Sequence, residues 1–454
     1  PSCGSAAAAP PRHGEEEAEP PLSEEQERLL EKVLERRQSV FFTGAAGTGK
    51  SRTLRELIRR APLQSTFVTA LTGMASTHLP RGTTLHSFAG IGHGKGSKEE
   101  LVQKVKGFRK SAKNWQDVDI LVIDEASMMS KALFEKLDFV ARKLRRKEEP
   151  FGGIVLCLCG DFFQLPPVSR GASGDDGMFC FESPLWSTCM QDPDNSAAQN
   201  CFALSKVFRQ KDNRLLELLS EVRYNQVTQR GLQTLAELQR VLVVKDGIEP
   251  TRLYPTNQRA DAVNQEKLAV LPGGEGQEWH YDAKDQVPDG LMLTPEQLDA
   301  MSTFPRRLHL KVGAQVMLIK NKSPSLVNGS RGVVEGLVPG LNGGPPTACV
   351  KFLNGESLLC TPEQDEKEVA GGRKVVRNQV PLRLSWAMTI HKAQGMSIDF
   401  LEVDLRNVFE AGQAYVALSR ARTIEGLRVL SYDARKFWTS PKVAAFYGAH
   451  VRPI

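Results

Sequence analysis

Four short apolar runs in the first 160 residues predict buried strands: Val40–Thr43, Ser65–Leu71, Asp119–Glu125 and Ile154–Cys159. The runs Asp119–Glu125 and Ile154–Cys159 are continuous rather than alternating, as in a parallel sheet that helices cover on both faces. Between these runs, Lys50–Arg60 places Leu54, Leu57 and Ile58 on one helical face. This order of strands and amphipathic helices predicts an α/β lobe.

The pattern changes twice along the rest of the chain. Arg214–Arg223 reads as a helix and Thr251–Asn264 as strand, turn and helix, which predicts a second α/β unit. Short strands with a strong hairpin signal at Asn354-Gly355 then follow, and they predict a small barrel-like β insert. Helix and strand patterns return after residue 381.

Composition and charge narrow the class of protein. A chain of 454 residues is too long for one core, so two or three domains are expected. Residues 1–21 contain Arg12 and four glutamates, a net charge of −3, and should be disordered. Because the whole chain has a formal net charge of +6, the remainder has +9. A positive body suits a polyanionic partner, and no apolar run approaches the length of a membrane span.

The eight cysteines contain no C-x-x-C pair, and Cys157 and Cys159 lie in an apolar run. They are interpreted as reduced, unligated residues, mostly of the core, in a protein from a reducing compartment.

The segment after the first strand carries the clearest chemistry. It reads G-x-x-x-x-G-K-S and consists of Gly44, Ala45, Ala46, Gly47, Thr48, Gly49, Lys50 and Ser51. Its glycines let backbone N–H groups converge on phosphate at a helix N-terminus, Lys50 can reach the β- and γ-phosphates, and the Ser51 hydroxyl can ligate Mg²⁺. This is a predicted nucleoside triphosphate site.

Two further strand ends carry polar residues that fit this chemistry. Asp124 is placed to hold Mg²⁺ together with Ser51, and Glu125 to deprotonate the attacking water. Gln164, in GDFFQLPP after the fourth strand, could sense the γ-phosphate or position the water.

Several positions stay open at this level. Gln26 completes the capping pattern S-x-x-Q with Ser23 but could also read an adenine edge. His86 and Phe88 could contact bases or belong to a loop or core. The basic run at residues 95–113 is a solvated helical face or a nucleic-acid contact, and Arg420 is a surface charge or reaches the γ-phosphate.

With these residues identified, the chain resembles the Pif (petite integration frequency) family of superfamily 1B DNA helicases, which are RecD-like. The resemblance runs from about Leu22 to Tyr432 and rests on four motifs in the family's order: GDFFQLPP, LVNGSRG, TIHKAQG and YVALSRAR. Met129–Arg142 also resembles the segment that separates Pif proteins from their RecD relatives.

The resemblance implies two RecA-like P-loop NTPase lobes with parallel sheets and ATP bound between them. The implied domains are a first lobe at 22–190, with a wedge insert at about 93–115, and a second lobe at 191–311 and 381–454. An SH3-like β-barrel insert is implied at 312–380. Two departures from the family are Ala393, where serine is frequent, and the absence of glycine in Arg223–Asn225.

The resemblance also implies roles for single residues. Gln26 becomes an adenine reader, Gly395 lies against the nucleotide, and Gln164 couples the lobes. Arg209 and Arg420 become arginine fingers. The residues implied to contact DNA are Thr72, Gly73, His86, Phe88, Thr389, His391 and Lys392.

The function implied is an ATP- and Mg²⁺-dependent DNA helicase that translocates 5′ to 3′ on single strands and separates duplex, forked or G-quadruplex DNA. Replication, repair, recombination and telomere maintenance in the nucleus or mitochondrion are the expected settings. The expected partners are single strands and single-strand/duplex junctions, with no membrane, and the expected form is a monomer with a DNA-induced dimer as the variant. Two alternatives stay open: a protein-displacing translocase that unwinds poorly, and a nucleotide-gated DNA-binding module.

Overall fold

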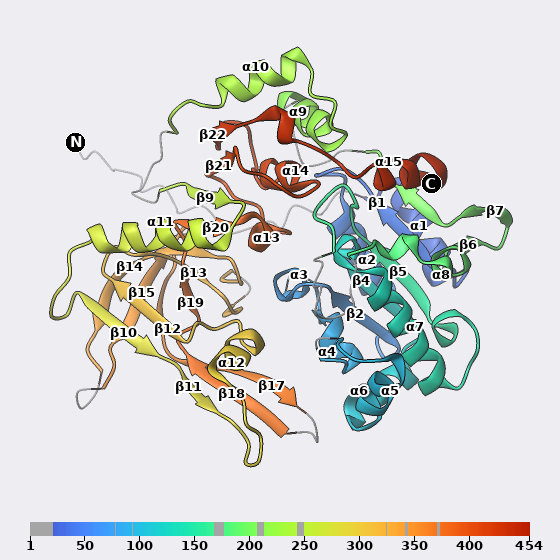
Figure 1. The fold of residues 1–454 in the computed structure, drawn as a ribbon, viewed down its shortest axis with the longest axis horizontal. Helices are drawn as coiled ribbons and strands as arrows, with labels where there is room; N and C mark the ends of the chain where they lie inside the picture. The colour runs from blue at the N-terminus through green and yellow to red at the C-terminus, as the bar shows by residue number, and fades with distance from the viewer. Residues whose placement is uncertain are drawn as a thin grey trace, which may run out of the picture.

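The structure is a computed structural model that describes residues 21–77, 79–92, 94–167, 177–206, 213–242, 249–323, 325–340, 344–369 and 373–454. It contains two parallel sheets and a separate group of antiparallel strands (Figure 1). The predicted mixed α/β class is confirmed. The predicted disordered tail, apart from Pro21, and Arg209 lie outside the described residues.

The first lobe is built on a seven-stranded sheet in the order β23-β8-β1-β5-β4-β2-β3, and every neighbouring pair in it is parallel. Its strands are β1 (Val40–Thr43), β2 (Thr66–Ala70), β3 (Thr83–Thr84), β4 (Ile120–Asp124), β5 (Val155–Cys159), β8 (Cys201–Ala203) and β23 (Arg452–Pro453). Phe41 packs into one core and Val40 and Phe42 into the other, because successive side chains of a strand point to opposite faces. Continuous apolar runs are therefore required here.

Helices cover both faces of this sheet. One core includes side chains of α1 (Glu24–Leu34) and α2 (Lys50–Arg60). The other includes side chains of α4 (Leu85–Ala89), α5 (Lys98–Lys106), α6 (Arg109–Asp117) and α7 (Lys131–Arg145). The remaining elements are α3 (Gly73–Thr77), α8 (Pro184–Cys189) and the 3₁₀ turns Ala126–Met128, Pro150–Gly153 and Cys180–Glu182. The basic segment 95–113 thus contains α5 and the first part of α6, whose apolar side is buried, with Leu101 and Val105 in the core and Trp115 following just after the segment.

The second lobe has a four-stranded parallel sheet in the order β20-β9-β21-β22. The strands are β9 (Thr251–Tyr254), β20 (Ala387–Thr389), β21 (Leu401–Leu405) and β22 (Leu427–Tyr432). Its helices are α9 (Asn213–Arg223), α10 (Gln229–Glu237), α11 (Asn257–Val270), α13 (Ile390–Ala393) and α14 (Gln413–Leu418), with a 3₁₀ turn at Ala434–Lys436. After α9 the chain turns at Asn225, whose φ of 55° is the left-handed conformation that glycine or asparagine adopts at a helix end. Asparagine therefore serves where the family commonly has glycine.

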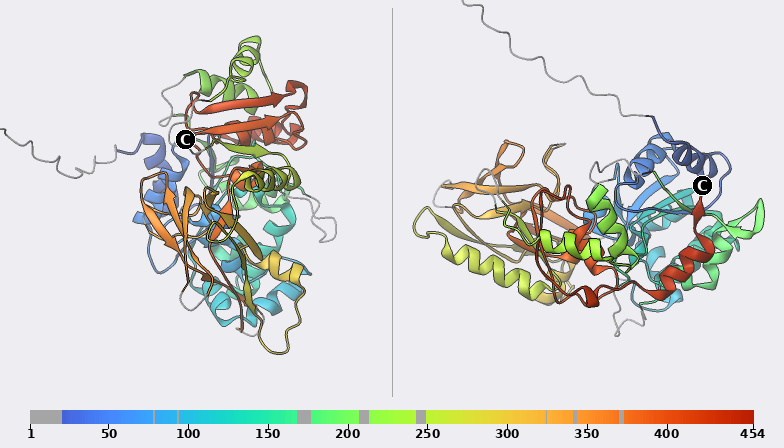
Figure 2. Two further views of the ribbon diagram at one scale, coloured as in Figure 1. Left: turned by 90° about the vertical axis from the view of Figure 1, so that its left-hand side faces the viewer. Right: turned by 90° about the horizontal axis from the view of Figure 1, so that it is seen from above.

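Two segments assigned to the second lobe by sequence lie on the first lobe. The hairpin β6 (Gln191–Asp192) and β7 (Asn195–Gln199) leads into β8, which pairs with β1. The C-terminal helix α15 (Pro441–His450) lies beside the first lobe (Figures 1 and 2). It buries Val443 and Phe446 in the core of that lobe, and β23 pairs with β8. The boundary at 190 and the placement of 441–454 are corrected accordingly. No family motif marks these strands, because their pairing depends on contacts far apart in sequence.

The β insert extends from about residue 278 to 384, which is wider than the predicted 312–380. A five-stranded antiparallel sheet has the order β16-β15-β14-β13-β19, and β10-β12 and β11-β18-β17 form two smaller sheets. The elements are β10 (Glu278–Asp282), β11 (Lys284–Gln286), α12 (Pro295–Met301), β12 (Arg307–Lys311), β13 (Gln315–Leu318), β14 (Arg331–Val338), β15 (Thr347–Phe352), β16 (Ser357–Cys360), β17 (Glu363–Val369), β18 (Arg373–Gln379) and β19 (Leu382–Leu384). The predicted hairpin at Asn354-Gly355 joins β15 to β16.

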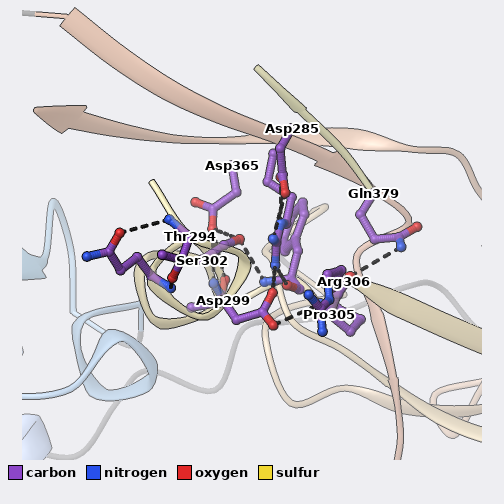
Figure 3. A network of polar contacts seen from close by, with 12 residues as sticks. Asp285, Thr294, Asp299, Ser302, Pro305, Arg306, Asp365 and Gln379 are labelled. Carbon is purple, nitrogen blue, oxygen red and sulfur yellow. Dashed lines mark hydrogen bonds and ion pairs between the residues drawn. The ribbon is translucent and has the colours of Figure 1, made fainter. Parts of the chain in front are cut away.

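A buried polar network fixes α12 and the loop after it to the insert (Figure 3). The Arg377 guanidinium is 2% exposed and donates to the carboxylates of Asp285 and Asp299 and to the carbonyl of Phe304. The Asp365 carboxylate accepts from the Ser302 hydroxyl at 2.7 Å. Because these bonds satisfy a buried charge, they hold residues 301–305 in one position at the edge of the cavity described below.

Candidate functional site

The phosphate loop links the end of β1 to the start of α2. Gly47 and Gly49 have φ of 85° and 86°, the left-handed region that glycine adopts without strain. A Cβ on Gly44 would lie 2.3 Å from the Thr48 hydroxyl, so the turn leaves no room for a side chain there. The Lys50 ammonium donates to the carbonyls of Gly44 and Ala45 at 2.6 and 3.1 Å, which holds it over the loop.

The acidic pair lies at the end of β4, and β5 separates this strand from β1. Glu125 has φ of 55°, a conformation that costs a non-glycine residue about 1–3 kcal/mol and is typical of functional sites. Burial and the neighbouring Glu125 carboxylate raise the pKa of Asp124 to about 7. The Lys50 charge opposes this shift but does not cancel it.

These residues suit a divalent cation. A serine hydroxyl on the first turn of α2 and a carboxylate at a strand end are hard oxygen donors of the kind that Mg²⁺ prefers. A cation beside Asp124 would also favour its ionised form, against the effect of burial. Ser51 and Asp124 are thus the residues that would hold Mg²⁺ with a nucleotide.

A side chain of the second lobe reaches Glu125. Gln394, which follows α13 and is 2% exposed, donates from Nε2 to Oε2 of Glu125 at 2.9 Å. A Cβ on the adjacent Gly395 would lie 3.5 Å from Oε1 of Glu125. Residues 394–395 therefore lie directly against the predicted general base.

The loop after β5 holds a second contact between the lobes, centred on the fully buried Asp161. The Arg223 guanidinium of α9 donates to its two carboxylate oxygens at 2.8 and 3.0 Å. The hydroxyls of Tyr415 in α14 and Tyr447 in α15 donate to the same carboxylate at 3.3 and 3.2 Å. Burial would raise the pKa of Asp161, but the Arg223 charge holds that pKa below its ordinary value.

The Tyr415 hydroxyl also accepts a hydrogen bond from the backbone N–H of Ala46 in the phosphate loop, at 3.2 Å. Tyr447 makes further bonds to the Thr43 hydroxyl, at 2.8 Å, and to the N–H of Phe162, at 3.1 Å. We call Asp161, Arg223, Tyr415 and Tyr447 the Asp161 cluster. It joins the phosphate loop, the second lobe and the C-terminal helix.

Among three predicted ATP-site residues, Gln26 and Arg420 have defined partners within the protein, whereas Gln164 has a buried oxygen without one. Gln26 forms the expected capping box with Ser23, is fully buried, and donates from Nε2 to the Thr53 hydroxyl at 3.0 Å. The Arg420 guanidinium donates to the carbonyls of Val416 and Met396 and to the Ser419 hydroxyl. Gln164 is 7% exposed, and its Oε1 is buried without a hydrogen-bond partner among the described residues.

A cavity of about 1570 Å³ runs between the two lobes and the β insert. Gly73 and His86 of the first lobe line it, together with Pro305 of the insert and Lys392 of the second lobe. Arg383 and Lys392 both line it and have no salt-bridge partner within the described ranges. Burial and the Arg383 charge lower the pKa of Lys392, and Asp261, which also lines the cavity, opposes this shift only in part. A phosphate here would therefore relieve a repulsion between two cations.

The other predicted DNA contacts are placed differently. Phe88 is 2% exposed and packs against Phe67 and Trp115 with ring centroids 5.2 and 5.1 Å away, so it is a core residue and its predicted base contact is corrected. Thr389 is buried and caps α13 by accepting from the N–H of Lys392. His391 pairs with Glu410 at 2.8 Å, and Thr72 accepts from the N–H of Ala75.

Sequence reasoning did not single out Asp161, Arg223, Tyr415, Tyr447 or Gln394. Asp161, Tyr415 and Gln394 stand inside GDFFQLPP, YVALSRAR and TIHKAQG, so their motifs held a signal. Arg223 drew notice only because no glycine follows it. Tyr447 lies in no motif, and only the packing of α15 on the first lobe identifies it.

The chain matches two family models. The model described as PIF1-like helicase matches residues 21–227, and the model described as DNA helicase Pif1, 2B domain, matches residues 295–337. The second match lies within the β insert. No helix in the described residues is long and apolar enough to span a membrane.

Curated proteins that are similar over most of this chain are named ATP-dependent DNA helicase PIF1. The ATP-dependent DNA helicase PIF1 of Danio rerio is 43% identical over 427 residues and that of Homo sapiens 42% over 426, in each case 93% of this chain and 63% of the relative. The chain thus spans just under two thirds of the length of these curated relatives.

Solved structures of Pif1 helicases are also similar to this chain over most of its length. The crystal structure of Pif1 helicase from Candida albicans has a TM-score of 0.83 and 38% identity, and covers 94% of this chain and 99% of that one. Pif1 helicase from Bacteroides, in complex with ADP-AlF3 and ssDNA, has a TM-score of 0.70 and 26% identity, covering 95% and 97%.

Proposed function

The chain belongs to the PIF1-like helicase family, and from that premise we propose that it is an ATP-dependent DNA helicase. One observation carries the proposal. A complete phosphate loop and acidic pair on the first lobe meet Gln394 of the second lobe, two residues after Lys392, which lines the cationic cavity. ATP chemistry and the cavity are therefore connected through one short segment of chain.

ATP binds with its phosphates on the N–H groups of residues 44–51 and with Lys50 against the β- and γ-phosphates. Ser51 and Asp124 would hold Mg²⁺, which would supply charge neutralisation at the phosphates. Glu125 accepts the proton of the attacking water. The Gln394 amide occupies one lone pair of Oε2, so Oε1 and the second lone pair of Oε2 remain available for this proton.

The second lobe responds to bound ATP through residues that contact the γ-phosphate. Arg209 and Arg420 act as arginine fingers on the γ-phosphate in this proposal. For Arg420 this requires release of the carbonyls of Val416 and Met396, to which it donates. Gln164 has a buried acceptor oxygen ready for a new donor at the same cleft. Closing and reopening of the cleft then alters the grip of each lobe on the strand.

The nucleic acid is single-stranded DNA that runs through the cavity between the lobes and the insert. Arg383 and Lys392 take phosphate oxygens, and His86 and Gly73 lie opposite them on the first lobe. Translocation 5′ to 3′, a monomeric form that pairs on DNA, activity on G-quadruplexes and a nuclear or mitochondrial location are the further parts of this proposal.

Strand separation on matched duplexes tests the proposal. With ATP and Mg²⁺, the protein should unwind a duplex with a 5′ single-stranded tail and leave the same duplex with a 3′ tail intact. Unwinding only from the 3′ tail would overturn the polarity. Displacement of streptavidin from a 5′-tailed biotinylated strand without duplex unwinding would favour the translocase alternative. ATP hydrolysis that single strands do not stimulate would contradict a motor altogether.

A further inference from the structure

We propose that Tyr415 is a positioning residue that links the phosphate loop to the movement of the second lobe. The inference rests on the proposed helicase function and adds a route for the signal besides the arginine fingers. Its starting point is the bond from the Ala46 N–H to the Tyr415 hydroxyl, at 3.2 Å, which joins two residues 369 positions apart in the chain.

The hydroxyl of Tyr415 has its donor and one acceptor position in use. It accepts from the Ala46 N–H and donates to Oδ2 of Asp161 at 3.3 Å. Tyr415 is 1% exposed, so water cannot readily replace either partner. If the hydroxyl moves away, the half-buried N–H of Ala46 loses this acceptor, and a phosphate oxygen can take its place. Phosphate binding and the position of Tyr415 are therefore linked at one N–H group.

The other end of this bond is anchored. Asp161 is held by two bonds from Arg223 and one from Tyr447, and Tyr447 is fixed in turn by Thr43 and Phe162 of the first lobe. The Arg223 guanidinium also lies over the ring of Phe163, 4.3 Å from its centroid. Tyr415 thus bonds to the phosphate loop on one side and, on the other, to a carboxylate that Tyr447 ties to the first lobe.

The helix that carries Tyr415 reaches the rest of the ATP site. At its N-terminus, Gly412 has φ of 72°, and a Cβ there would lie 2.2 Å from the carbonyl of Phe163 and 2.7 Å from that of Gln164. Just beyond its C-terminus, Arg420 donates from Nε to the carbonyl of Val416 at 3.0 Å. A shift of α14 at Tyr415 is therefore transmitted to the backbone of Gln164 on one side and to Arg420 on the other.

Tyr415→Phe removes the hydroxyl and keeps the ring. The matched control is Tyr281→Phe in the β insert, because Tyr281 is also buried and its hydroxyl donates to a single carbonyl, that of Pro346, at 3.0 Å. The measured quantity is the ratio of two dissociation constants for a fluorescent single strand, one with ADP and one with a non-hydrolysable ATP analogue. Fluorescence anisotropy gives both.

The proposal predicts that the ratio in the wild type differs from one and that Tyr281→Phe has the same ratio. In Tyr415→Phe the ratio should move toward one by a factor of about five, the effect of one neutral hydrogen bond. Hydrogen exchange at Ala46 in the nucleotide-free protein should be faster in Tyr415→Phe. A wild-type ratio of one would mean that the proposed function fails. A wild-type ratio retained in Tyr415→Phe, or unchanged exchange at Ala46, would overturn the inference about Tyr415 alone.

Discussion

Removal of Arg223 should destabilise the protein strongly, because it leaves a buried carboxylate without its counter-charge. Asp161 is fully buried and Arg223 is 5% exposed, and two hydrogen bonds of 2.8 and 3.0 Å join them. Breaking a buried ion pair by deleting one partner costs about 3–5 kcal/mol, whereas an apolar replacement of both partners is often nearly neutral. Arg223→Met should therefore cost about 3–5 kcal/mol. The double variant Arg223→Met/Asp161→Leu should recover part of that loss, because it removes the buried charge but also the acceptor of the Tyr415 and Tyr447 hydroxyls.

The assay is urea unfolding followed by tryptophan fluorescence, with the change in midpoint multiplied by the slope of the wild-type transition. Arg435→Met serves as the control, because Arg435 pairs with Asp433 on the surface and should not shift the midpoint measurably. A loss below about 1 kcal/mol in Arg223→Met, or a double variant as unstable as the single one, would refute the account of the Asp161 cluster as a charge-compensated contact between the lobes.

Three further predictions concern the cluster, the base and the cavity. As pH falls through the lowered pKa of Asp161, the ion pair loses its contribution, so the destabilisation by Arg223→Met should shrink between pH 7 and about 3; an equal loss at both pH values would contradict this. Gln394→Ala should reduce the stimulation of ATP hydrolysis by single-stranded DNA, because the contact between Glu125 and the segment that carries Lys392 is lost; steady-state rates with and without DNA test this, and an unchanged ratio would refute it. Lys392→Ala should weaken single-strand binding and lower the salt dependence of log Kd by about 0.7, one phosphate contact; an unchanged salt slope would remove Lys392 from the binding surface.

The parts of the site that a short stretch of chain determines could be predicted from sequence. The phosphate loop needs only one strand, three glycines and one helix start, and each lies where the pattern placed it. The acidic pair at the end of β4 follows from an apolar run that ends in two carboxylates. Local sequence determines these features because their geometry is made by neighbouring residues.

Positions that depend on distant packing could not be predicted. Phe88 has the aromatic character of a base-stacking residue, yet it is buried between Phe67 and Trp115, and only the fold distinguishes the two uses. Tyr447 becomes part of the Asp161 cluster because α15 packs on the first lobe. No sequence motif predicts this packing. The double role of Gln26, which caps α1 and also donates to Thr53, likewise requires the packing of α1 on α2.

The central claim is that the site at Lys50 and Glu125 hydrolyses ATP in response to single-stranded DNA. The most direct measurement is the steady-state rate of phosphate release with and without a single-stranded oligonucleotide, for the wild type and for Glu125→Gln. The account predicts DNA-stimulated hydrolysis in the wild type and its loss in Glu125→Gln, with single-strand binding retained. Equal rates in the two proteins, or a wild-type rate that DNA leaves unchanged, would contradict it.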